Sequence, residues 1–234
     1  MGLTVIVCSR REYDKEFVEH LKSTCGVDDA LICFVTNQDN AGLGKVYNHY
    51  LQEDENPNDV TVFVHDDVEF LKDGWGAEIL RLFEEHKDYG IIGVAGSSQF
   101  DENGMWWNYE KKYGQVLHRD GDKSWLTMFS PLLDHDLEEV CCVDGLFIAV
   151  HRDRITKRFD ESFTFDFYDI DLCVSNFEDK KTKIGVTTNI RMAHKSVGKP
   201  RESWEEAKQR FLEKHKGTLP INMPKSGSKK NGSK

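Results

Sequence analysis

The feature that most constrains this chain is an apolar strand that ends in three polar residues. Thr61 to Val64 are β-branched or aromatic, His65, Asp66 and Asp67 follow, and the chain then returns to apolar residues. Such a run is typical of a central strand of a parallel sheet. In open α/β sheets, ligands bind just beyond the carboxyl ends of the strands. The segment therefore predicts an α/β fold with a candidate site where this strand ends.

Strands and helices alternate along the first 95 residues. Apolar strands are predicted at residues 3–8, 30–35, 60–64 and 90–95, and helices at about 13–26, 44–51 and 75–86. The first helix is indicated by Tyr13, Phe17 and Leu21, which recur every four residues as an inner stripe. This alternation predicts a Rossmann-like, mostly parallel sheet flanked by helices, with right-handed crossovers.

The regular alternation stops after residue 95. Residues 96–138 are rich in glycine, aspartate and aromatics and show no sustained period, which is typical of functional loops or small insertions. Later elements are expected as a strand at 140–150 interrupted by Asp144-Gly145, a helix at 166–179, a strand at 184–188 and a last helix opened by a capping box at Ser203–Glu206.

Length and composition narrow the class of protein. At 234 residues with a net charge of -10, the chain fits one large domain, and it lacks the basic footprint that nucleic acid or an anionic membrane requires. No apolar run approaches the roughly 18 residues of a membrane span, and the N-terminus does not resemble a signal peptide. We expect a cytoplasmic protein, with a domain at 1–216 and a disordered tail or linker at 217–234, where no apolar residue follows Lys225.

Acidic and histidine residues stand at the ends of several predicted elements. Carboxylate oxygens suit Mg²⁺ or Mn²⁺, which commonly bridges protein carboxylates to substrate phosphates. Asp67 together with His194 would make an ordinary oxygen and nitrogen site for Mn²⁺. The plainer interpretation is a solvated turn with a helix cap at residues 65–67, and for His194 a surface histidine or one satisfied in the core.

A second group of carboxylates opens the helix predicted at 166–179. Asp166 and Asp169 could be an N-cap and a first-turn carboxylate favoured by the helix dipole. Asp169 and Asp171 lie on opposite sides of Ile170, about 100° away each, so at most one of them should point into a shared pocket. The sequence leaves open which of the two does so.

Several short motifs follow one another in a fixed order. They are Ser9-Arg10, Thr36-Asn37, Gly42-Leu-Gly-Lys-Val-Tyr-Asn48, Val62-Phe-Val-His-Asp-Asp67, Gly90-Ile-Ile-Gly-Val-Ala-Gly96, Val143-Asp-Gly145, Phe159-Asp-Glu161, Phe167-Tyr-Asp-Ile-Asp-Leu172 and His194. In this order they resemble a family 2-type glycosyltransferase. The chain is most similar to short glycosyltransferase-like domains that carry His-x-Asp in place of the usual Asp-x-Asp, and the resemblance covers about Leu3 to Gly198.

The resemblance implies a single-domain glycosyltransferase A-type fold with a nucleotide-binding half at about 1–95 and an acceptor and catalytic half at about 96–216. It implies a nucleotide-diphosphate-sugar donor, first of all a UDP-sugar, and Mn²⁺ or Mg²⁺ as cofactor. The implied roles are nucleotide or donor binding by Ser9, Arg10, Asn37, Lys45, Asn48, His65 and Asp66, metal binding by Asp67 and His194, and general-base catalysis by Asp169. Whether His65 or Asp66 contacts the metal or the ribose stays open.

Sugar transfer needs the chemistry that these residues offer. A metal can neutralise the leaving phosphates, and a carboxylate can take the proton of the attacking hydroxyl. An apolar wall of Phe165, Phe167 and Tyr168 would raise the pKa of Asp169 toward a useful range. We therefore expect an inverting, metal-dependent glycosyltransferase acting on a glycan or other hydroxyl acceptor.

Two other functions compete with this one. A nucleotidyltransferase shares the sheet type, but it usually shows a Gly-rich basic loop after the first strand, and Ser9-Arg10-Arg11-Glu12 contains no glycine. A noncatalytic module that binds sugars or nucleotide-sugars would keep Asp67 and need no base. In that case the substitution Asp169→Asn would leave its function intact.

Overall fold

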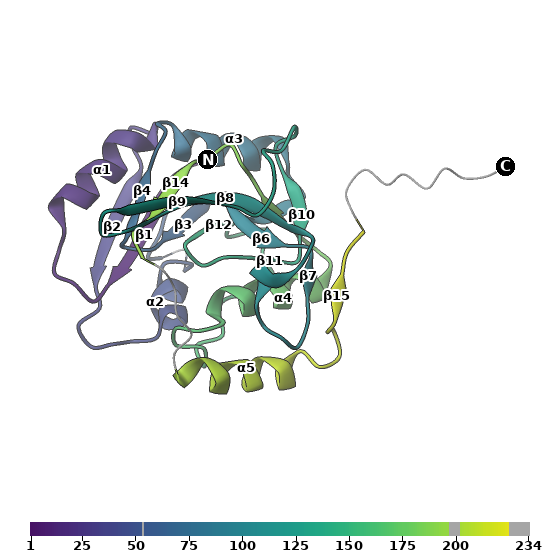
Figure 1. Cartoon of the computed structure of the whole chain (residues 1–234). Helices are drawn as coiled ribbons and strands as arrows, with labels where there is room; N and C mark the ends of the chain where they lie inside the picture. The colour runs from purple at the N-terminus through teal and green to yellow at the C-terminus, as the bar shows by residue number, and fades with distance from the viewer. Residues whose placement is uncertain (53, 197–201, 225–234) are drawn as a thin grey trace.

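A mixed seven-stranded sheet forms the centre of the molecule, as the computed structural model of residues 1–52, 54–196 and 202–224 shows (Figure 1). Its strand order is β10 (Glu138–Val140), β13 (Lys183–Val186), β5 (Tyr89–Gly93), β12 (Phe147–His151), β3 (Val60–Val64), β1 (Leu3–Ser9) and β2 (Leu31–Thr36). The pairs β1–β2, β1–β3 and β5–β13 are parallel, as expected from the alternation of strands and helices. Strand β12 runs antiparallel between β3 and β5.

Helices cover both faces of this sheet. They are α1 (Lys15–Cys25), α2 (Leu43–His49), α3 (Trp75–Glu85), α4 (Tyr168–Asp179) and α5 (Glu202–Lys214). In the view of Figure 1, α1 and α3 lie above the sheet, and α2, α4 and α5 lie below it. Helix α1 begins where the Asp14 side chain accepts a hydrogen bond from the Phe17 N–H at 2.9 Å, and it ends at Gly26 in the left-handed conformation. Phe17 and Leu21 of the predicted stripe are buried, whereas Tyr13 lies before the helix and is 57% exposed.

The single strand expected at 140–150 is three strands. Val140 ends β10, Cys142 and Val143 form β11, and β12 begins at Phe147. Strand β11 leaves the central sheet and pairs with β6 (Ala95–Ser97), whereas β12 returns to its middle. The Asp144-Gly145 turn between them redirects the chain.

A second sheet is built largely from the region expected to be irregular. Its order is β11, β6, β8 (Lys112–Asp120), β14 (Met192–His194) and β4 (Val68–Phe70), with β9 (Lys123–Met128) paired to β8. Strand β8 pairs with β14, more than 70 residues away in the sequence. Its other partners, β9 and β6, are close in sequence, but the local sequence carries no period that would reveal the strand.

The C-terminal region differs from the sequence expectation in two places. Ile221 and Asn222 form β15, which pairs with β7 (Gln99–Phe100), so ordered structure continues past residue 216, where the tail was expected to begin. The part of the expected tail at 225–234 lies outside the described residues. Ser203 was expected to cap α5, but its hydroxyl donates to the Asp166 carboxylate at 2.8 Å.

One continuous hydrophobic core joins the two halves of the chain. Leu3 and Phe63 come from the first half, and Phe147, Leu172 and Phe211 come from the second, and all are buried in the same cluster. Across the described part of the chain, no helix has the length and apolar character needed to cross a bilayer.

Candidate functional site

The candidate site lies where β3 ends, as the apolar run predicted. The three polar residues that follow β3 are directed to different partners, because the chain turns there before it enters β4 at Val68. Asp66 is directed toward the end of β1, Asp67 toward β14, and His65 toward the start of α4. This short segment therefore joins three separate parts of the fold.

Asp66 lies beside the end of β1. Its carboxylate accepts hydrogen bonds from the Ser9 hydroxyl and, at 3.1 Å, from Nε of Arg11. The Asn37 backbone N–H donates to the Ser9 carbonyl at 2.7 Å, which brings the end of β2 to the same place. Arg11 was not among the predicted site residues. Only the parallel register of β1 and β3 brings it to Asp66.

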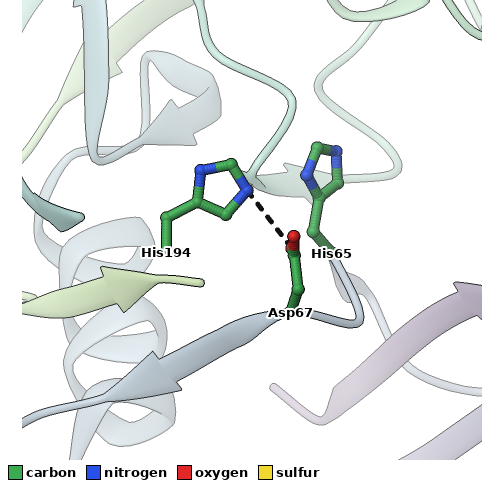
Figure 2. A group of neighbouring side chains, drawn as sticks. All are labelled: His65, Asp67 and His194. Carbon is green, nitrogen blue, oxygen red and sulfur yellow. Dashed lines mark ion pairs between the residues drawn. The ribbon is translucent and has the colours of Figure 1, made fainter. Parts of the chain in front are cut away.

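Asp67 and His194 lie side by side. The antiparallel pairing of β14 with β4 places His194 opposite Val68, and Nε2 of His194 is 3.2 Å from Oδ1 of Asp67. Figure 2 shows both side chains converging with His65. One ligand atom of each of the three residues lies within 4.8 Å of the others. We call His65, Asp67 and His194 the histidine-aspartate cluster.

Opposite charge dominates the electrostatics of this cluster. Burial alone would raise the pKa of Asp67, but the side chains of His194 and Ser196 hold that pKa well below its usual range. Burial would likewise lower the pKa of His194, and the Asp67 carboxylate raises it instead. Burial lowers the pKa of His65, which favours its neutral form. A neutral imidazole beside a carboxylate is the state in which both can bind a metal.

The cluster meets the chemical requirements of a divalent cation. Oδ1 of Asp67 is buried, and among the described residues it makes no well-formed hydrogen bond. Buried polar atoms are almost always satisfied, so such an atom calls for an explanation. A carboxylate with two imidazoles is a donor set that suits Mn²⁺. These three residues can therefore hold the ion that the sequence resemblance implies.

Asp169 lies at the start of α4, next to the Asp144-Gly145 turn. Its Oδ2 accepts a hydrogen bond from the Gly145 N–H at 2.7 Å, and its Oδ1 accepts one from the Ile170 N–H at 2.9 Å. Burial, followed by the nearby Asp144 carboxylate, raises the pKa of Asp169 to about 7. The pKa of Asp169 is therefore raised, which is the predicted direction, although the Asp144 carboxylate contributes to the rise as well as the apolar neighbours.

The backbone just before Asp169 is strained. Phe167 precedes α4 with φ of 66°, a left-handed conformation that costs a bulky residue about 1 kcal/mol. The Phe167 ring is buried and packs against Phe211 and Trp204 of α5. Packing by α5 therefore stabilises the backbone conformation from which α4 begins. Strain of this kind is common near functional sites.

Asp144 is a site residue that the sequence analysis did not select. Its Oδ1 accepts the Leu146 N–H at 2.9 Å, and its Oδ2 accepts the indole N–H of Trp106 at 3.1 Å. Its charge also acts on Asp169, His65 and His194. The signal for it was present in the sequence, since an Asp-Gly pair interrupting an apolar strand marks a chain reversal at a strand end.

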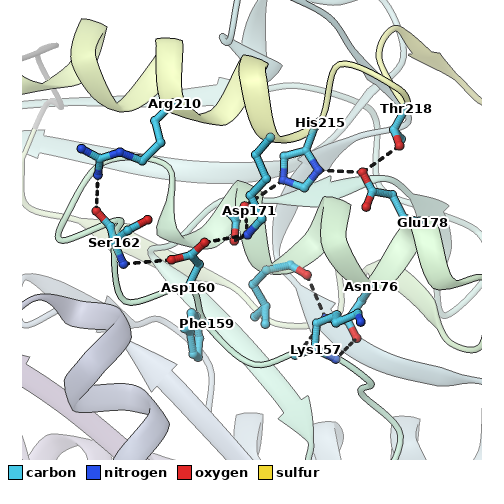
Figure 3. A network of polar contacts seen from close by, with 12 residues as sticks. Lys157, Phe159, Asp160, Ser162, Asp171, Asn176, Glu178, Arg210, His215 and Thr218 are labelled. Carbon is cyan, nitrogen blue, oxygen red and sulfur yellow. Dashed lines mark hydrogen bonds and ion pairs between the residues drawn. The ribbon is translucent and has the colours of Figure 1, made fainter.

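Asp171 points away from the candidate site. Its carboxylate is fully buried and is paired with the Lys214 ammonium at 2.8 Å and with Nε2 of His215 at 2.8 Å. Nδ1 of His215 lies 2.6 Å from Glu178 (Figure 3). We call Asp171, Glu178, Lys214 and His215 the clamp cluster, because it joins α4 to the end of α5. Of the two aspartates flanking Ile170, only Asp169 lies next to the Gly145 turn.

The other predicted donor-binding residues either fasten loops or are exposed to solvent. Asn37 bonds with Ala41 through both side-chain atoms, which closes the loop after β2. Asn48 bonds with the backbone of Phe159 at 2.9 and 3.0 Å and so fastens the loop before α4. Arg10 and Lys45 are exposed to solvent. Among the described residues, no hydrogen bond or ion pair links these four residues to the histidine-aspartate cluster.

Three comparisons relate the chain to known proteins. The sequence profile described as "Glycosyltransferase like family" matches residues 4–215. A search of curated proteins finds no match. Among solved structures, GalNAc-T7 with UDP, GalNAc and Mn²⁺ is similar with a TM-score of 0.53 and 9% identity, over 91% of this chain and 47% of that chain. The crystal structure of A197 from STIV has a TM-score of 0.46 and 12% identity, over 84% and 87%.

Proposed function

Because this chain belongs to the glycosyltransferase-like family and has the glycosyltransferase A-type fold, we propose that it is an inverting, metal-dependent glycosyltransferase. Its donor would be a nucleotide-diphosphate-sugar and its acceptor a hydroxyl group of a glycan or similar molecule. One observation carries the proposal: the Tyr168 hydroxyl links His65 of the histidine-aspartate cluster to Gly145, whose N–H donates to the perturbed carboxylate of Asp169.

The histidine-aspartate cluster would hold the metal. Asp67 and His194 offer the ligand pair predicted from the sequence, and His65 offers a third ligand. A bound Mn²⁺ or Mg²⁺ would supply positive charge to a leaving diphosphate. GalNAc-T7, whose structure holds UDP and Mn²⁺, has a similar fold and supports a UDP-sugar and manganese as the first choices.

Asp169 would act as the general base. A pKa of about 7 lets this carboxylate be ionised yet basic enough to accept a proton near neutral pH. As the oxygen of the acceptor hydroxyl forms a bond to the anomeric carbon, the proton of that hydroxyl passes to Asp169. The bond from that carbon to the diphosphate oxygen breaks with its electron pair, and the nucleoside diphosphate leaves. In-line attack inverts the anomeric centre.

Nucleotide binding would fall to the ends of β1 and β2. Ser9 and Asp66 already contact each other there, and the Asn37 loop and Arg10 adjoin them. Arg11, which pairs with Asp66, is a further candidate for the nucleotide. Asn48 would act on the donor through the loop that it fastens, and Lys45 would approach the donor from the exposed side of α2.

A ligand panel with a matched variant tests this proposal. Wild type and Asp67→Ala are compared by thermal shift with UDP-, GDP- and dTDP-sugars, with and without Mn²⁺. A ligand at about 100 times its dissociation constant adds roughly 2.7 kcal/mol of stability. We expect one nucleotide class to raise the Tm of the wild type only with Mn²⁺, and not to raise that of Asp67→Ala. If no nucleotide-sugar shifts the wild type, or if both proteins shift equally, the proposed donor site is wrong.

A further inference from the structure

The hydroxyl of Tyr168 lies between the histidine-aspartate cluster and the Gly145 turn. Tyr168 is the first residue of α4 and is 3% exposed. Its hydroxyl oxygen is 3.2 Å from Nε2 of His65 and 3.2 Å from the carbonyl oxygen of Gly145. The N–H of the same Gly145 donates to Asp169 at 2.7 Å. Tyr168 and Asp169, which are neighbours at the start of α4, therefore bond the carbonyl and the N–H of Gly145.

The glycine is required for this contact. A Cβ atom at position 145 would lie 2.3 Å from the Tyr168 hydroxyl and 3.0 Å from Oδ2 of Asp169. Both distances are shorter than ordinary contacts, so any side chain here would displace Tyr168 and Asp169. The bare backbone of Gly145 is what lets the tyrosine reach a carbonyl and a histidine at once.

Counting protons fixes the direction of these hydrogen bonds. A carbonyl oxygen can only accept, so the one proton of the Tyr168 hydroxyl goes to Gly145. The hydroxyl oxygen then has only lone pairs to offer His65, and Nε2 of His65 must donate a proton to it. A neutral histidine that carries its proton on Nε2 has a free lone pair on Nδ1.

A neighbouring tyrosine does not alter this count. Tyr47 is 1% exposed, packs against Tyr168 and interacts with its hydroxyl. A phenol oxygen has two lone pairs, so it can accept one hydrogen bond from Tyr47 and another from His65 while it donates its own O–H to Gly145. In this arrangement all three partners of the Tyr168 hydroxyl are satisfied together.

We propose that Tyr168 is a positioning residue that holds His65 in the Nε2–H tautomer and so presents the Nδ1 lone pair to a divalent cation bound by Asp67 and His194. The metal role rests on the proposed function, whereas the tautomer does not. Histidines that bind metals generally donate their other N–H to a fixed acceptor, which sets the tautomer and the ring orientation. Tyr168 would fill that place here, and it would tie the metal ligand to the turn that holds Asp169.

The first test needs neither metal nor activity. In metal-free wild-type protein with ¹⁵N-labelled histidine, long-range ¹H–¹⁵N correlation spectra at pH 8 distinguish a protonated from an unprotonated ring nitrogen. His65 is assigned by its loss in His65→Gln. We expect Nε2 to carry the proton, and Tyr168→Phe to give a mixture of tautomers. An Nδ1–H tautomer in the wild type would overturn the proposal, whatever reaction the protein performs.

The second test measures Mn²⁺ affinity by calorimetry, with Mn²⁺ as the only ligand. Loss of such an outer partner typically weakens metal binding by about 10- to 100-fold, and we expect that loss for Tyr168→Phe. Tyr47→Phe removes a buried hydroxyl next to it that does not contact His65, and should stay within about threefold of wild type. Equal affinities of wild type and Tyr168→Phe would contradict the proposal. The Tm of each variant shows that it is folded.

Discussion

Two clusters in this protein each set an aspartate against a histidine but differ in how their atoms are paired. In the histidine-aspartate cluster the half-buried Asp67 lies 3.2 Å from a histidine, and in the clamp cluster the buried Asp171 lies 2.8 Å from one. In the clamp cluster, His215 is held by a carboxylate on each ring nitrogen, and Lys214 also contacts Asp171. In the histidine-aspartate cluster, Oδ1 of Asp67 is buried and lies 3.2 Å from Nε2 of His194, but this contact is not a well-formed hydrogen bond.

The difference shows how a structural ion network can be told from a ligand site. A buried charge that is fully paired within the protein stabilises the fold only when its partners stay in place. A buried polar atom that lacks a well-formed hydrogen bond is costly, and it is retained where a ligand supplies a better contact. Figure 3 shows the network of the clamp cluster, and Figure 2 shows the ion pair of Asp67 and His194 beside His65. Three sets of measurements test this contrast.

The largest expected effect concerns Asp169, on the side of α4 that faces the Gly145 turn. Asp169→Asn should lower kcat by about 10²- to 10⁴-fold, because general-base catalysis contributes on that scale. Donor binding should be spared, since the amide keeps an oxygen for the Gly145 N–H. The measurement is steady-state sugar transfer, with the donor Kd from calorimetry.

A control on the same helix makes this result specific. Asp179 ends α4 and should tolerate Asp179→Asn with kcat within about twofold of wild type, because it lies far from the turn. Turnover of Asp169→Asn at the wild-type rate would reject Asp169 as the base. It would also favour a noncatalytic binding module.

The next effect concerns the stability of the clamp cluster. Asp171→Asn leaves Lys214 and His215 facing each other without their shared carboxylate, and breaking a buried pair in this way costs about 3 kcal/mol. Urea unfolding followed by circular dichroism measures the change. The exposed pair of Lys15 and Glu19 provides the comparison, since Glu19→Gln should cost less than about 1 kcal/mol. Equal costs for both substitutions would show that the clamp cluster does not stabilise the fold.

The smallest effect is the response to pH. As the pH rises, the activity that depends on Asp169 should increase, whereas the stability contributed by His215 should decrease. Asp169 must lose its proton to act, so kcat/KM should rise with pH and level off above its pKa of about 7. The carboxylates around His215 raise its pKa above the ordinary value of 6.5 in spite of burial. The stabilisation from His215 is therefore fully present below pH 6.5 and is lost as the pH rises through the folded pKa.

Melting curves between pH 5.5 and 8.5 test the stability part. The difference in Tm between wild type and His215→Gln should shrink as the pH rises. A Tm difference that stays constant or grows would contradict the charged state of His215 on which this prediction depends. A kcat/KM that falls between pH 6 and 8 would contradict the role of Asp169 as a base.

Sequence reasoning located the candidate site through patterns that are local. The apolar strand before His65 had to be buried, so the polar residues after it had to emerge at a strand end, where they lie. Helical spacing separated Asp169 from Asp171, and the structure places them on different sides of α4. The donor-binding roles of Asn37 and Asn48 stay predictions, because a side chain that fastens a loop looks the same in sequence as one that binds a ligand.

The chain's own order of residues determined the alternation of strands and helices and the point where charge meets the buried sheet, since both follow from hydrophobic period and backbone preference over a few residues. Tertiary structure alone decided that Arg11 meets Asp66, that β8 joins β14, and that Tyr168 reaches both His65 and Gly145. Those contacts join residues up to about a hundred positions apart, and only the packing of the finished sheets brings them within reach.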